Sequence, residues 1–96
     1  MTYMRQLADS IQDSVGDRLA LDGGDSLALL YALLARTKGT AVTNEDVHDA
    51  WVTWCELRGR NHASAVPFRD LSADTQAKDT PLAAAIRDVA AALETT

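Results

Sequence analysis

Residues 27–35 read LALLYALLA and form the longest apolar run of the sequence. Leucine and alanine are among the strongest helix formers, Asp25 suits an N-cap, and Gly39 offers a C-terminal stop. We therefore predict a helix over residues 27–36 that is nearly all buried and forms the centre of the core. A membrane span needs about 20 apolar residues, so we expect no transmembrane segment.

The segment before this run predicts a first helix. Its apolar side chains recur at steps of three and four residues from Met4 to Val15, which is the spacing of one helical face. Gly16 ends the pattern. Residues 17–24 contain a glycine pair and no periodicity, so we predict a connection there.

A third helix is predicted over residues 44–58. Thr43 can cap its first turn, and Gly59 ends it. Its apolar stripe runs through Val47, Trp51, Trp54 and Arg58. The following segment, residues 60–71, has no period and contains Pro67, so we predict an irregular, partly apolar loop packed on this helix, with Phe68 buried against Trp51.

Two further helices complete the chain. Ser72 and its neighbours resemble a cap that opens a short helix reaching Lys78, and Thr80 precedes a proline at the first position of a final helix. The final helix carries an apolar stripe with many alanines, which permit close contact. The pattern predicts one all-α domain over residues 1–96, a compact bundle of about four main helices plus a structured proline-containing loop. Residues 1–40 are expected to form a helical hairpin.

Composition narrows the function classes. Fourteen acidic against nine basic residues among 96 give a net charge of −5, which disfavours a nucleic-acid-binding protein, because phosphate contacts need positive charge. The single Cys55 cannot pair within the chain, and the N-terminus lacks the apolar stretch of a signal peptide. We therefore expect a cytoplasmic protein. The excess of Asp, Arg and Ala suggests a high-GC bacterium or its phage.

The only basic block lies in the third quarter of the chain. Guanidinium groups bind phosphate and carboxylate well, so this block predicts a site for a small anionic ligand. The alternative is that its arginines pair with nearby carboxylates at the surface. The block consists of Arg58, Arg60, His62 and Arg69.

His48 admits two interpretations. It borders the apolar stripe of the third helix, so its ring either donates a hydrogen bond that locks the loop onto the helix or contacts a ligand together with His62. Trp51 and Trp54 are likewise either core residues or a ligand platform. Cys55 is seven residues from His48, about 10 Å along a helix, so the two cannot form a nucleophile and base pair. We predict no catalytic residue, metal or cofactor.

From Val47 onward the sequence resembles the ryanodine-receptor-type repeat, or RyR domain, which also occurs as small bacterial and phage proteins. The similarity covers about residues 47–80, and the family's Gly-Trp-x-x-Gly segment is reduced here to Gly59-Arg60-Asn61. On this resemblance, residues 43–95 are the RyR-like half of the domain. The residues that carry it are Val47-His48-Asp49-Ala50-Trp51, His62, Val66-Pro67-Phe68-Arg69-Asp70-Leu71 and Asp79.

The resemblance implies a recognition module for nucleotide-type ligands. Together with the basic block, it predicts a non-enzymatic binding module with a groove between helix 44–58 and loop 60–71. The alternative is a protein interaction module or homodimer that seals an apolar helix against its partner and has no small ligand. The predicted ligand-binding residues are His48, Trp51, Arg58, Arg60, His62, Phe68 and Arg69.

Overall fold

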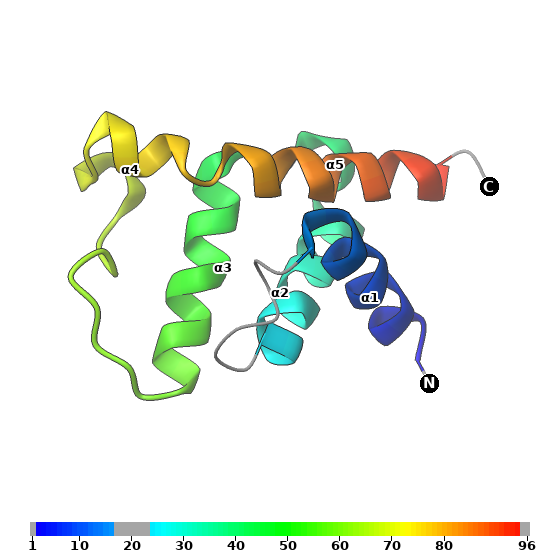
Figure 1. Ribbon diagram of the computed structural model, residues 1–96, viewed down its shortest axis with the longest axis horizontal. Helices are drawn as coiled ribbons and strands as arrows, with labels where there is room; N and C mark the ends of the chain where they lie inside the picture. Colours follow the sequence, from blue (N-terminus) through cyan, green and yellow to red (C-terminus); the bar gives the residue numbers. More distant parts are fainter. Residues whose placement is uncertain (1, 17–23, 95–96) are drawn as a thin grey trace.

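The computed structural model describes residues 2–16 and 24–94, and within them all regular structure is helical. The predicted all-α class is therefore confirmed. The longer helices are separated by two short 3₁₀ turns and one five-residue helix (Figure 1). In chain order the elements are α1 (Tyr3–Val15), α2 (Gly24–Thr37), η2 (Gly39–Ala41), α3 (Asn44–Leu57), η3 (Phe68–Asp70), α4 (Ala73–Ala77) and α5 (Thr80–Glu94).

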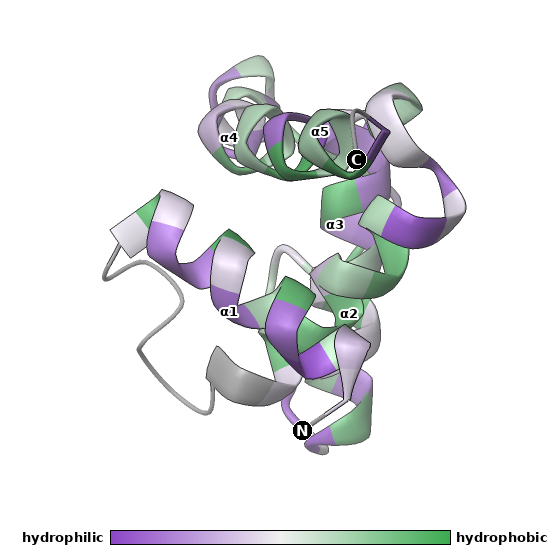
Figure 2. Ribbon diagram, turned by 90° about the vertical axis from the view of Figure 1, so that its right-hand side faces the viewer, coloured by the Kyte–Doolittle hydropathy of each residue, from purple (hydrophilic) through white to green (hydrophobic). Residues whose placement is uncertain are grey.

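The core lies where α5 crosses the α1–α2 pair. Figure 1 shows α5 running along one side of the molecule, over α1 and α2 and past the first turn of α3. Its apolar side faces α1 and α2 in Figure 2. Ala83 and Ala90 are buried there beside Ile86, so two small side chains let the helices approach closely.

Helix α2 is the central element, as predicted, but it is not buried all round. Tyr31 and Ala32 are almost completely buried, whereas Leu33 is 51% exposed. A helix that packs against neighbours on part of its circumference leaves the rest in solvent, whatever its composition. The N-cap predicted at Asp25 is wrong, because α2 begins at Gly24 and Asp25 therefore lies inside the helix. Gly24 likewise belongs to α2, and the rest of the connection predicted at 17–24 lies outside the described residues.

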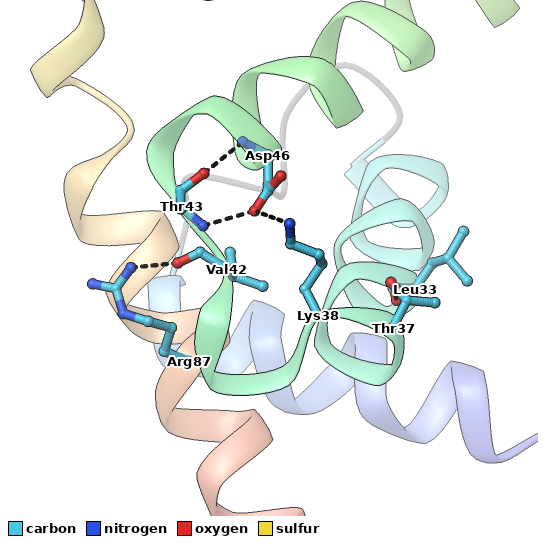
Figure 3. A network of polar contacts seen from close by, with 7 residues as sticks. All are labelled: Leu33, Thr37, Lys38, Val42, Thr43, Asp46 and Arg87. Atoms are coloured by element: carbon cyan, nitrogen blue, oxygen red, sulfur yellow. Dashed lines mark hydrogen bonds and ion pairs between the residues drawn. The ribbon is translucent and has the colours of Figure 1, made fainter.

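A network of polar contacts fixes the elbow between α2 and α3 (Figure 3). Thr43 and Asp46 form a reciprocal capping box, in which each side chain accepts a hydrogen bond from the other's backbone amide. Lys38 pairs with the same Asp46 carboxylate at 3.5 Å, and Arg87 of α5 donates to the carbonyl of Val42 at 2.8 Å. These contacts set the direction in which α3 leaves the core.

The segment between α3 and α4 runs back alongside α3 (Figure 1). Gly59 turns the chain out of the helix with a positive φ of 66°, a conformation that suits glycine. The predicted packing on α3 is borne out for Phe68, whose ring contacts that of His48. Leu71 is also half-buried, but Val66 and Pro67 remain exposed. Only part of the loop is therefore buried against the rest of the protein.

Hydrogen bonds connect α4 and the start of α5 to the first turn of α3 and to the segment around η3. The Asn44 side chain, at the start of α3, donates to the Thr80 hydroxyl at 2.8 Å and to the Gln76 carbonyl at 3.3 Å. The side-chain amide of Gln76 donates in turn to the backbone carbonyl oxygens of Phe68 and Leu71. No helix in the described ranges is long and apolar enough to cross a membrane.

Candidate functional site

His48 holds the loop against α3. Its ring is only 4% exposed, and its Nε2 atom lies 2.6 Å from the Val66 carbonyl oxygen. Because a carbonyl oxygen only accepts, Nε2 carries the hydrogen and donates it. This bond is the one that the first interpretation of His48 predicts.

Aromatic rings continue outward from His48 on both sides. Trp51, one turn further along α3, has its ring centroid 5.8 Å from that of His48, and it meets His62 edge to face at 5.1 Å. Phe68 packs on His48 at 5.9 Å. The prediction that Phe68 is buried against Trp51 is therefore corrected: its ring is half-buried and its partner is the imidazole.

The loop also fixes the orientation of His62. The backbone amide of Ser64 donates to His62 Nδ1 at 3.0 Å. An accepting Nδ1 carries no hydrogen, so the neutral ring has its proton on Nε2. His62 therefore presents an N–H donor on the side of the ring away from the backbone.

These side chains line an open pocket of about 210 Å³. Its walls come from α2, α3, the loop, α4 and the two residues between α4 and α5. The pocket therefore extends beyond the predicted groove between helix 44–58 and loop 60–71. The lining residues are Tyr31, His48, Trp51, His62, Ser64, Thr75, Lys78 and Asp79.

Two titratable groups at the pocket have shifted pKa values. Burial raises the pKa of the Asp79 carboxyl above its usual value, although nearby His48 offsets part of the effect. Burial also raises the pKa of the Tyr31 hydroxyl, and the negative charge of Asp79 raises it further. Burial therefore disfavours the charged form of both groups, and the Tyr31 hydroxyl also responds to the charge of Asp79.

The predicted site residues separate into two groups. His48, Trp51 and His62 line the pocket, with Phe68 packed on His48. Arg58 and Arg60 each place a guanidinium 5.3 Å from the Trp54 ring centroid, and neither is among the lining residues.

The arginines therefore do not form one cluster with the histidines at the pocket. Arg69 is exposed on η3 and also lies outside the lining set. The physical reason is that the guanidinium groups of Arg58 and Arg60 stack on Trp54, which does not line the pocket.

Sequence reasoning missed Tyr31, Ser64, Thr75 and Lys78 as lining residues, and it singled out Asp79 only through the family resemblance. Tyr31 is the one side chain with a polar atom in the run 27–35, which is the feature that could have identified it. Lys78 and Asp79 are opposite charges between α4 and α5, and both line the pocket.

A metal ion has no evident place here: across residues 2–16 and 24–94, no three His, Cys, Asp or Glu side chains lie close enough together to hold one. The lone Cys55 is buried. What the pocket offers is hydrogen-bond donors and acceptors beside an aromatic wall.

Comparison with known proteins identifies the family of the chain but indicates no activity or ligand. A family model described as a domain of unknown function, DUF7701, matches residues 2–91, so the chain belongs to this family. No curated protein and no solved structure shows significant similarity to it.

Proposed function

We propose that this member of the DUF7701 family is a binding module whose pocket beside α3 takes a small ligand with an anionic group. The observation that carries the proposal is the convergence of two donors at one pocket. Lys78 supplies an ammonium group, and His62 supplies the Nε2 hydrogen left by its bond with Ser64. Trp51, whose ring contacts those of His48 and His62, adds an aromatic wall to the pocket.

The resemblance to the RyR domain gives independent support. Four of the residues on which it rests, which are separated in the sequence, line this one pocket: His48, Trp51, His62 and Asp79. The nucleotide-type ligand implied by the resemblance is consistent with an aromatic wall next to a cation. A volume of about 210 Å³ lies below the range of about 300–1,000 Å³ that is typical of pockets for drug-sized ligands, so the pocket suits a small group or a single ring.

We propose binding without catalysis. Among the described residues no hydroxyl or thiol is hydrogen-bonded to an imidazole: His48 Nε2 donates to the Val66 carbonyl, and His62 Nδ1 accepts from the Ser64 backbone amide. Cys55, the only thiol, is buried. A ligand recovered chemically unchanged after prolonged incubation supports this role, and a modified product contradicts it.

A thermal-shift screen of nucleoside monophosphates and sugar phosphates at low salt tests the proposal. A ligand at 100 times its Kd adds about 2.7 kcal/mol to the free energy of unfolding. Lys78→Met should abolish the shift, whereas Arg69→Met, which removes an exposed cation outside the lining set, should retain it. Absence of a shift with every anion, or an equal shift in Lys78→Met, contradicts the proposal.

A protein interaction module or homodimer is the second candidate. Leu33 favours it, because this side chain is half exposed on α2 beside a mainly apolar groove of about 380 Å³ that includes Leu30, Leu34 and Ala50. Light scattering distinguishes the two candidates. A dimer that Leu33→Asp converts to a monomer, in a protein that binds no anion, favours the second.

A further inference from the structure

Part of the pocket lining suits a cationic group, in contrast to Lys78 and His62, which suit an anionic one. Tyr31 is 2% exposed, and its side chain reaches the pocket from α2. Its hydroxyl makes no hydrogen bond to any of the described residues. A phenol normally has a hydrogen-bond partner. The Tyr31 oxygen is not among the buried unpaired atoms of the described residues, so it is reached from the pocket, where water or a ligand can supply that partner.

The Asp79 side chain is the second pocket group without a hydrogen-bond or ion-pair partner among the described residues. It is half-buried, and within residues 2–16 and 24–94 its carboxylate forms neither an ion pair nor a hydrogen bond, even though Lys78 is its neighbour in the chain. A carboxylate in a partly dry site is best satisfied by a charge-assisted bond from an N–H donor that carries a positive charge.

Trp51 favours the same kind of group. Its ring is half-buried and forms a wall of the same pocket. The face of an indole attracts cations through its quadrupole, and the attraction grows when the cation is desolvated. Three lining residues, Tyr31, Trp51 and Asp79, therefore suit an ammonium or amidinium group.

We propose that the ligand is a small zwitterion, with its cationic group against Asp79, Tyr31 and Trp51 and its anionic group against Lys78 and His62. This inference rests on the proposed function, because it keeps the anion site and adds a cation site. Lys78 and Asp79 line the same small pocket without pairing with each other, so a ligand whose two charges are separated by a few bonds can contact both of them.

Phosphoethanolamine and propyl phosphate form the matched pair of probes. They have nearly the same shape and the same phosphate, but the ammonium of the first is a methyl group in the second. Calorimetry on the full chain should give a Kd at least about tenfold lower for phosphoethanolamine, a difference of about 1.4 kcal/mol. Equal Kd values for the two probes overturn the inference while leaving the anion site in place.

Variants separate the two sites. Asp79→Asn should weaken the binding of phosphoethanolamine alone and so make the two Kd values similar. Tyr31→Phe should reduce the ratio of the two Kd values by a smaller factor. Lys78→Met should weaken both probes. If neither probe binds to the wild type, the proposed function itself fails. If Asp79→Asn leaves the ratio unchanged in a protein that melts cooperatively, only the cation site fails.

Discussion

The Nε2 atom of His48 lies 2.6 Å from the carbonyl oxygen of Val66, 18 residues further along the chain. This bond joins the second turn of α3 to the loop 60–71. The ring of Phe68 supplies a further contact between the loop and α3. Because the same imidazole lines the pocket and contacts Trp51, the bond that holds the loop also fixes a wall of the candidate site.

Removing the donor at His48 should loosen the loop. His48→Leu leaves the Val66 carbonyl without its partner, and we expect a loss of about 2 kcal/mol in the free energy of unfolding measured in urea. His48→Gln can still donate one hydrogen bond and should lose less. Equal stability of wild type and His48→Leu would show that the bond contributes nothing.

Phe68→Ala should cost about 2 kcal/mol. Truncating a fully buried Phe costs about 3–5 kcal/mol, but this ring is half-buried and packs mainly on one imidazole. Val66→Ala, at an exposed neighbour that keeps its backbone carbonyl, should change stability by less than about 0.5 kcal/mol. A loss above about 4 kcal/mol for Phe68→Ala would mean that the ring is buried more deeply.

Arg87→Met should destabilise the elbow shown in Figure 3. The change removes the bond from Arg87 to the Val42 carbonyl while keeping an unbranched apolar side chain, so we expect a loss of about 1.5 kcal/mol in urea unfolding. Arg69→Met serves as the matched control at an exposed arginine. Similar losses in both variants would refute a specific role for this bond.

The raised pKa of Asp79 predicts a pH dependence of stability. The folded chain binds this proton more tightly than the unfolded chain, whose Asp pKa is about 3.9. The contribution of Asp79 to stability is therefore present below that value and is lost as pH rises toward the folded pKa. Asp79→Asn, which stays neutral, should be more stable than the wild type at pH 7.

The stability difference between Asp79→Asn and the wild type should shrink as pH falls toward 4. Thermal unfolding across this range measures it. Asp74→Asn is the control at an exposed carboxyl, where the same substitution should not reproduce the pattern. A wild type that is more stable than Asp79→Asn at pH 7 would reverse the assigned sign.

Helix boundaries were predictable because local chemistry decides them. Thr43 caps α3 and Gly59 turns the chain out of it, as the sequence predicts, and Gly16 follows the end of α1. The exposure of Leu33 was not predictable, because the surroundings of a uniformly apolar helix depend on where α1, α3 and α5 pack against it.

The site was predictable only where its residues share one segment. His48 and Trp51 lie one helical turn apart, so their common surface follows from the sequence. Tyr31 and Asp79 meet them only through tertiary packing. The arginines illustrate the converse: proximity in sequence suggested a cluster with His62, but Arg58 and Arg60 stack on Trp54.

The two tryptophans occupy unlike environments, and this gives the protein a built-in optical reporter. Trp51 is half-buried at the pocket beside His62, whereas Trp54 is 4% exposed beneath two guanidinium groups. Occupation of the pocket should therefore alter the fluorescence emission of Trp51 and leave that of Trp54 almost unchanged. A Trp54→Phe protein would report binding from a single indole, free of background, and needs no external label.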